Sequence, residues 1–199
     1  IGRKLPIYLS IDEMEALISA IDRSMPQGER DYAIVETLYA CGLRVSELIN
    51  LKIRDIYQSD GLIRVIGKGN KERIVPIYPK ALNAIYRYIK EIRSHVEVQK
   101  GFEDFVFLNQ RGKSLSRVYV FKRIASLASI AGIKKRIGPH TLRHTFATHL
   151  IQNGADIIVI QSLLGHESIT TTEIYTHLEQ SHLRAVSYTH LTLPTTRCV

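Results

Sequence analysis

The chain has 199 residues and a formal net charge of +8, with 27 Lys and Arg against 19 Asp and Glu. This length supports one large or two small domains whose core needs neither disulfides nor metals, and the two cysteines, Cys41 and Cys198, form no motif and indicate a reducing compartment. No apolar run approaches the length of a membrane span, so we expect a cytoplasmic protein whose positive charge favours a polyanionic partner.

The N-terminal part is predicted to form two helices. Residues 10–13, Ser-Ile-Asp-Glu, fit a capping box, in which a serine and a glutamate three residues later bond to free N–H groups at a helix start. Pro26 and Gly28 are expected to break this helix, and apolar residues at helical spacing predict a second one from about Arg30 to Gly42. The chain therefore begins as a helical protein.

A further helix start follows at once, and its charged residues allow two interpretations. Arg44 and Glu47 lie three positions apart, so on a helix they share one face. In the first interpretation they form a surface ion pair, which contributes little to stability. In the second, Arg44 binds a phosphate and Glu47 holds it in place. Local sequence favours neither.

The next segment changes from helical spacing to β-branched runs, which are typical of strands. The runs 62–66 and 73–77 flank the glycine-rich stretch 67–72 and predict a hairpin, with residues 55–58 as a third strand. Lys68 lies at the predicted tip. It is either an ordinary solvated lysine or a flexible ammonium that reaches a DNA groove and protonates a leaving oxygen.

Helical patterns return after the hairpin. Pro79 opens one predicted helix, and Ser116 is placed to cap another that Gly132 closes. Together with the hairpin, these elements indicate an α+β protein that is predominantly helical and has a small three-stranded antiparallel sheet.

The stretch 138–178 concentrates side chains that suit phosphate chemistry. His140 and Arg143 follow a proline and lie three apart, so they are predicted to project together from a helix start, where an anion is favoured. His166 is expected at a turn after a glycine. Tyr175, on a later helix, is the candidate nucleophile, although a phenol with an ordinary pKa of about 10 needs a base or cationic surroundings to attack.

Helix boundaries are also predicted in this stretch. The face of the first helix that is expected to be buried consists of Leu142, Phe146 and Leu150. Asn153-Gly154 would close this helix, and Asp156 would cap a second helix that runs to Leu164.

Simpler interpretations of these residues exist. Tyr175 is one of ten tyrosines and could merely pack its ring. His140 and His144 have the spacing of a metal-binding pair, but the pattern lacks the glutamate of a zincin motif and a third ligand at helical spacing. The two helices around Asn153-Gly154 also fit a helix-turn-helix that only reads DNA.

Taken in order, these elements resemble the catalytic domain of the tyrosine recombinases, the phage integrase family. The resemblance rests on Arg44, Lys68, the His-Thr-Leu-Arg motif 140–143, Leu-Leu-Gly-His 163–166 and the Ile-Tyr-Thr-His spacing 174–177. GLRVSEL, VIGKGNKERIVP and LLGHESITTTEIYTHL are especially similar to the bacterial Xer recombinases. The match runs over residues 5–183 and implies the fold of that catalytic domain.

The resemblance implies an enzyme that cuts and rejoins DNA without metal, ATP or other cofactor. Tyr175 would attack the scissile phosphate to form a 3′-phosphotyrosyl bond and release a 5′-hydroxyl. Lys68 would be the acid for the leaving oxygen, and His140 would assist proton transfer at the tyrosine. The 5′-hydroxyl of a partner strand would then reverse the step, which exchanges the strands.

Charge balance would come from three further groups. The resemblance implies that Arg44 and Arg143, helped by His166, stabilise the charge of the phosphorane-like transition state. Losing one such donor typically costs on the order of a hundred- to thousandfold in rate.

The resemblance also implies an organisation and a set of partners. Residues 1–186 would be the catalytic domain, and the N-terminal DNA-binding domain of the family is expected to be absent from this sequence. The tail 187–199 lacks the amphipathic pattern of a last helix and repeats Tyr-Thr-His-Leu, so we expect it to be non-native or frame-altered, which makes Tyr188 a decoy. The partners would be a double-stranded recombination site, a homo- or hetero-tetramer and an accessory DNA translocase, with no membrane.

Two alternative functions are kept. A type IB topoisomerase relaxes DNA with a similar set of residues, but commonly has a lysine where His140 stands. A non-catalytic helical DNA-binding module would need neither Lys68 nor Tyr175. The role of a recombinase, whether chromosome dimer resolution or integration and excision of a mobile element, does not follow from the motifs.

Overall fold

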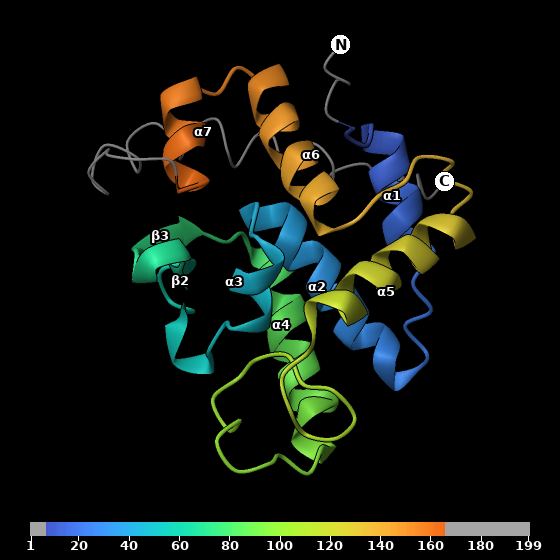
Figure 1. Cartoon of the computed structure of the whole chain (residues 1–199), viewed down its shortest axis with the longest axis vertical. Coiled ribbons are helices and arrows are strands. Elements are labelled where there is room, and N and C mark those ends of the chain that lie inside the picture. The colour runs from blue at the N-terminus through green and yellow to red at the C-terminus, as the bar shows by residue number, and fades with distance from the viewer. Residues whose placement is uncertain (1–6, 166–199) are drawn as a thin grey trace, which may run out of the picture.

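A computed structural model describes residues 7–165 of the chain (Figure 1). In this range the elements, in chain order, are α1 (Ile11–Ser19), α2 (Pro26–Cys41), α3 (Val45–Ile49), the 3-10 turn η1 (Ile53–Asp55), β1 (Ile56–Tyr57), β2 (Leu62–Ile66), the 3-10 turn η2 (Lys68–Asn70), β3 (Glu72–Pro76), α4 (Pro79–Glu91), the 3-10 turn η3 (Arg93–His95), α5 (Arg117–Ile130), α6 (Pro139–Gln152) and α7 (Ile157–Leu163). The predicted α+β architecture, mostly helical with a small sheet, is confirmed.

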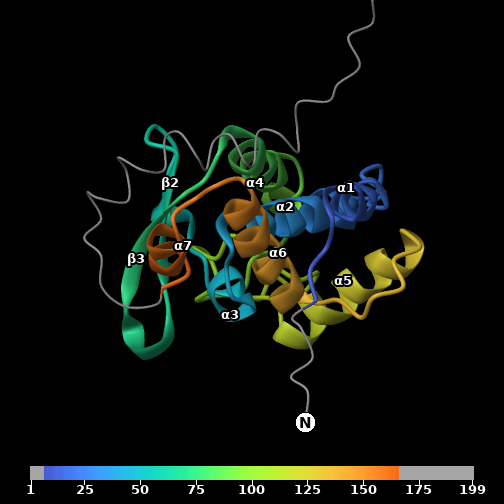
Figure 2. The same ribbon diagram turned by 90° about the horizontal axis from the view of Figure 1, so that it is seen from above.

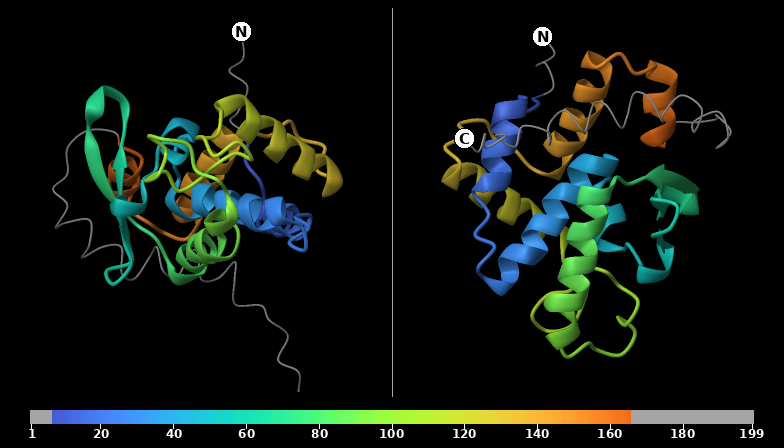
Figure 3. Two further views of the ribbon diagram at one scale, coloured as in Figure 1. Left: turned by 90° about the horizontal axis from the view of Figure 1, so that it is seen from below. Right: turned by 180° about the vertical axis from the view of Figure 1, so that it is seen from behind.

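Helix α2 is the centre of the fold. It packs against α1, α3, α4 and α6, and Figures 1 and 3 show it running alongside α4 through the middle of the molecule. It begins at Pro26 rather than near Arg30, because a proline at the first helical position needs no N–H partner and already has a helical φ. The helix ends at Cys41, and the C-cap residue Gly42 has a left-handed φ of 58°, a conformation that glycine adopts without a steric penalty.

The sheet is antiparallel in the order β1-β2-β3, as predicted. Val75 pairs with Ile63 and Arg73 pairs with Val65. Residues two apart on a strand point to the same face, and Ile63, Val65 and Val75 are all buried. Arg73 therefore lies on the face of the sheet that faces the core.

Helices α6 and α7 follow the predicted boundaries. The expected buried face of α6, Leu142, Phe146 and Leu150, is at most 1% exposed. Asp156 caps α7 by accepting a hydrogen bond from the N–H of Ile158 at 2.7 Å. Figure 2 shows α7 between α6 and the β2–β3 hairpin, and contacts on both sides hold it there.

Two side chains of α6 anchor the segment that precedes α1. The N–H of Leu9 donates to Thr145 Oγ1 at 3.0 Å, and the Leu9 carbonyl lies 2.9 Å from His149 Nε2. The other ring nitrogen of His149 lies 2.7 Å from the Tyr39 hydroxyl in α2. The start of the described chain is thus fixed to the helix that bears His140 and Arg143.

No helix within residues 7–165 is both long enough and apolar enough to cross a membrane.

Candidate active site

Arg143 lies on α6, and its side chain is anchored by backbone carbonyls from two other segments. Its Nη1 donates to the carbonyl of Gly42 at 2.6 Å, and its Nη2 donates to the carbonyl of Leu164 at 2.5 Å. A guanidinium has five N–H donors in a rigid plane, so two carbonyls at fixed positions also fix the direction of the group. The ends of α2 and α7 therefore hold Arg143 in place.

Arg44 lies close to Arg143, because α3 begins on the same side of the molecule. Its backbone is extended, which places it as the N-cap residue of α3. The carboxylate of Glu47 accepts hydrogen bonds from the Arg44 N–H at 2.8 Å and from Arg44 Nη1 at 3.0 Å. The interpretation of this pair as a surface ion pair is wrong, because the Glu47 side chain is only 1% exposed. Glu47 does hold Arg44, as the second interpretation expects, and the binding of a phosphate by Arg44 stays a prediction.

Glu47 is the common partner of three arginines. Besides Arg44, it accepts two hydrogen bonds from Arg73, at 2.7 and 3.0 Å, and its Oε2 lies 3.9 Å from Arg143 Nη1. Burial by itself raises the pKa of Glu47, but the hydrogen bonds and charge of Arg73, followed by the hydrogen bonds of Arg44, outweigh it and bring the pKa below its ordinary 4.5. The carboxylate is therefore ionised at neutral pH and offsets part of the positive charge around it.

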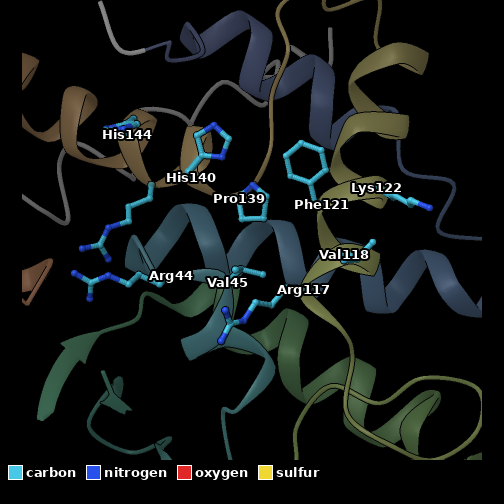
Figure 4. A pocket seen from close by; sticks show the side chains of 10 residues that line it. Arg44, Val45, Arg117, Val118, Phe121, Lys122, Pro139, His140 and His144 are labelled. Carbon is cyan, nitrogen blue, oxygen red and sulfur yellow. The ribbon is translucent and has the colours of Figure 1, made fainter. Parts of the chain in front are cut away.

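The two arginines border a pocket of about 690 Å³ (Figure 4). Its lining residues, drawn from α3, α5 and α6 and the positions that start them, are Arg44, Val45, Arg117, Val118, Phe121, Lys122, Pro139, His140, Arg143 and His144. Burial, and after it the charge of Arg44, lowers the pKa of Arg143 to about 10, so this guanidinium remains cationic at neutral pH. The pocket thus has a strongly positive edge, which suits an anionic group.

His140 lies on the first turn of α6 and is exposed at this pocket. Its ring lies parallel to that of Phe121 in α5, with the centroids 6.5 Å apart and an interplanar angle of 11°. His144, one turn further along α6, lines the same pocket. Between Ile7 and Gly165, however, no three His, Cys, Asp or Glu side chains come close enough together to hold a metal ion.

Lys68 lies apart from the residues that line the pocket. It is exposed in η2, at the tip of the β2–β3 hairpin, as the sequence predicted. The adjoining Gly67 faces Glu47 and Arg73, since a Cβ built on it would lie 3.4 Å from Glu47 Oε1 and 3.7 Å from Arg73 Nη1. The hairpin therefore brings the neighbour of Lys68, but not Lys68 itself, against the residues that hold Arg44.

The predicted site residues fall into three groups. Arg44, Arg143 and His140 border one pocket, although they come from distant parts of the chain. Lys68 is on the neighbouring hairpin. His166 and Tyr175 lie outside the described residues, which end one position before His166.

Arg73 is not among the residues that the motifs predict for the site. It stands in a β-branched run, which predicts only a strand. The signal that would have found it is alternation: Val75 and Ile77 are apolar, and Arg73 occupies the next position on the same face. A cation on the buried face of a strand needs a partner, and the partner here is Glu47.

Most of the chain matches a single protein family, since residues 8–182 fit the phage integrase family. The chain belongs to the phage integrase family. The resemblance inferred from the motifs is therefore confirmed. This integrase-family chain is 47% identical over 185 residues to the tyrosine recombinase XerD of Listeria innocua, a match covering 93% of this chain and 62% of that protein. It is 45% identical over 182 residues to XerD of Staphylococcus aureus strain Mu50, covering 92% and 61%.

Solved structures of Xer recombinases also match this chain. The crystal structure of the XerA recombinase matches with a TM-score of 0.73 and 38% identity, over 96% of this chain and 67% of that one. The XerH recombinase in a pre-cleavage complex with its difH substrate also matches with a TM-score of 0.73, at 32% identity over 87% and 51%. This integrase-family chain spans about 62% of the length of the curated XerD relatives, so it corresponds to part of those proteins.

Proposed function

We propose that this chain is the catalytic part of a site-specific recombinase that cuts and rejoins double-stranded DNA through a 3′-phosphotyrosyl intermediate. The observation that supports it best is the convergence of Arg44 and Arg143 on one pocket, with the buried Glu47 holding one of them and lying near the other. Two fixed guanidinium groups at the edge of an open pocket match what a phosphodiester requires, because each can bond to two phosphate oxygens. The domain would extend over residues 1–186.

The chemistry would proceed by two transesterifications. The phenol oxygen of Tyr175 forms a bond to the scissile phosphorus, and the bond from phosphorus to the 5′-oxygen breaks. The phenol proton leaves with the help of His140, and the 5′-oxygen takes a proton from Lys68. The number of phosphoester bonds is unchanged, so no nucleotide cofactor is needed. A 5′-hydroxyl from a partner strand then displaces the phenol and regenerates the enzyme.

Stabilisation of the transition state would come from Arg44, Arg143 and His166. The phosphorus gains negative charge on its non-bridging oxygens as the tyrosine attacks, and donors that are already fixed need no reorganisation at that moment. The anchoring of Arg143 by the carbonyls of Gly42 and Leu164 supplies that fixed geometry. Removing either arginine should therefore slow cleavage far more than it weakens DNA binding.

The DNA would lie across the pocket and its positive edge. Arg117 and Lys122 of α5 are exposed and line the pocket, and they are placed to contact neighbouring phosphates. The XerH structure contains its difH substrate, which supports a specific recombination site as the ligand here. We further include in this proposal a homo- or hetero-tetramer on DNA, an accessory DNA translocase and a cytoplasmic location. Chromosome dimer resolution and movement of a mobile element are both consistent with it.

A covalent trap tests the proposal. The full chain is incubated with a pool of nicked duplexes whose half-sites are randomised around the nick, so that the short cleaved fragment diffuses away and the adduct accumulates. Protein that migrates with DNA on a denaturing gel is recovered, and sequencing of the attached DNA gives the preferred site. We expect an adduct from the unchanged chain, none from Tyr175→Phe with DNA binding retained, and a normal adduct from the control Tyr188→Phe.

Two outcomes would contradict the proposal. Adduct formation by Tyr175→Phe would show that another residue is the nucleophile, and an unchanged chain that binds DNA without forming any adduct would favour a non-catalytic DNA-binding module. Recombinase and topoisomerase are then separated with the selected site: a recombinase exchanges strands between two duplexes, whereas a topoisomerase only relaxes one.

A further inference from the structure

Arg73 connects three parts of the molecule through a single side chain. It stands on β3, five positions after Lys68, and its side chain is 13% exposed. Its Nη1 and Nη2 donate to the two carboxylate oxygens of Glu47 at 2.7 and 3.0 Å, and its Nε donates to the carbonyl of Leu163 at 2.8 Å. One guanidinium thus ties the hairpin to the start of α3 and to the end of α7.

Each of these two anchor points also holds one of the proposed phosphate-binding arginines. The Glu47 oxygens that accept from Arg73 accept from Arg44 as well, at 3.0 Å from its Nη1. The carbonyl of Leu164, next to the one that Arg73 binds, accepts from Arg143 at 2.5 Å. A shift of Arg73 would therefore move the partners of both Arg44 and Arg143.

The turn after α7 is packed directly on Arg73. A Cβ built on Gly165 would lie 3.3 Å from Arg73 Nη1 and 3.4 Å from its Cδ, and the left-handed φ of 76° already favours glycine there. This turn leads into His166, another member of the proposed site. The geometry at the end of α7 thus depends on Arg73 both by hydrogen bonding and by packing.

Burial argues against direct contact of Arg73 with DNA. Three of its five N–H donors face protein acceptors, and it does not line the pocket that Arg44 and Arg143 share. A simple stabilising ion pair would explain the bonds to Glu47. It would not explain the third bond, to the α7 carbonyl adjacent to the one that binds Arg143.

We propose that Arg73 is a positioning residue for DNA cleavage, which acts through Glu47 and the end of α7 to hold Arg44 and Arg143 at the phosphate. This inference rests on the proposed recombinase function. It assigns to the hairpin a role besides carrying Lys68, because its second strand, β3, bears the side chain that fixes how the two arginines meet the phosphate.

The test is a double-substitution cycle on the rate of covalent adduct formation. The full 199-residue chain is used at saturating concentration of the nicked duplex selected above, so that the single-turnover rate reports cleavage and not binding. The variants are Arg73→Gln, Arg44→Lys and the double variant. The matched control is Arg64→Gln, because Arg64 is an arginine of the same sheet, on the strand next to β3, that also bonds to a carboxylate, that of Asp55.

We expect Arg73→Gln to slow cleavage by about a hundredfold, the usual cost of displacing catalytic groups by around 1 Å. DNA affinity should stay within about threefold, because the donors of Arg73 that are lost face the protein. In the Arg44→Lys background the same change should cost less than about fivefold, since groups that act as a unit are not additive. The Arg64→Gln control should cleave at close to the unchanged rate.

A purely structural role predicts a different pattern. If Arg73→Gln only reduced the amount of folded protein, it would lower the rate by the same factor in the unchanged chain and in Arg44→Lys. Equal factors in these two backgrounds would therefore overturn the inference. So would a rate for Arg73→Gln within about threefold of the unchanged chain, far below the loss that misplaced catalytic groups cause. If Arg73→Gln does not fold, Arg73→Lys, which keeps the charge but not the fork, replaces it in the cycle under the same criteria. Failure of the unchanged chain to form any adduct would instead refute the proposed function, and this inference with it.

Discussion

The carboxylate of Glu47 offers the sharpest stability prediction, because a single buried group holds two arginines at once. It accepts four hydrogen bonds of 2.7 to 3.0 Å, from the backbone and side chain of Arg44 and from two nitrogens of Arg73. Glu47→Gln keeps the shape but removes the charge, and the new amide N–H groups would face guanidinium donors. Breaking a buried pair in this way typically costs about 3–5 kcal/mol.

The lower end of that range applies here. The Arg44 side chain is 37% exposed and regains water when its partner is lost, so we expect about 3 kcal/mol at neutral pH. For a chain of this size that corresponds to a fall in melting temperature of about 6–12 °C. The assay is urea unfolding followed by circular dichroism. The matched control is Glu72→Gln, since Glu72 is 51% exposed and 3.6 Å from its arginine, and should change stability by less than about 0.5 kcal/mol.

The pH dependence gives the same prediction a second test. Because the pKa of folded Glu47 is lowered below 4.5, its contribution to stability is fully present above that pH and is lost as pH falls through the folded pKa. The stability gap between the unchanged chain and Glu47→Gln should therefore be constant near neutrality and close below pH 4.5. A gap smaller than about 0.5 kcal/mol at pH 7 would refute the reasoning, because it would mean that the buried carboxylate contributes no more than an exposed one.

Two further predictions concern α6 and its neighbours. Gly42→Ala should cost about 2–4 kcal/mol of stability, because φ is 58° and the new Cβ would lie 2.3 Å from Phe146 Cδ1. The control Gly132→Ala has a similar φ of 73° but open space around it, so it should cost only about 1 kcal/mol. Urea unfolding measures both. His149→Gln should cost about 2 kcal/mol, since it disrupts the buried link to Leu9. Burial lowers the pKa of His149, so the unchanged chain should lose stability as pH falls below 6.5, where the unfolded chain takes up a proton that the folded ring resists. If His149→Gln lost as much stability as the unchanged chain when the pH falls below 6.5, that loss would have to come from other groups.

Much of the fold followed from local patterns. Helix starts at Ser10, Pro79 and Ser116, the hairpin around Lys68 and the buried face of α6 were all predicted, because capping, turn chemistry and apolar spacing act within a few residues. The predicted start of α2 at Arg30 is wrong, because Pro26 is the first residue of this helix and does not break it.

The residues of the candidate site were predicted from the sequence, but some of the contacts that hold them were not. The motif order predicted Arg44, Lys68, His140, Arg143, His166 and Tyr175 as candidate site residues, and their roles stay predictions. It also led to the integrase family, which the match over residues 8–182 confirms. The burial of Glu47 and its bonds to Arg73 were not predicted. In the sequence, Glu47 has one visible charged neighbour, at i−3, whereas its second partner lies on a strand that approaches it only after the hairpin has packed against α3 and α7.

The amino-acid sequence alone determined which residues have the chemistry for a phosphodiester and in which elements they stand, because residue type and local spacing depend only on near neighbours along the chain. Only the tertiary structure decided how Arg44 and Arg143 are held. Their partners are a buried carboxylate and the backbone carbonyls that follow α2 and α7. A hydrogen bond forms only when donor and acceptor lie about 3 Å apart, and the separation of two residues along the chain does not say whether folding brings them that close.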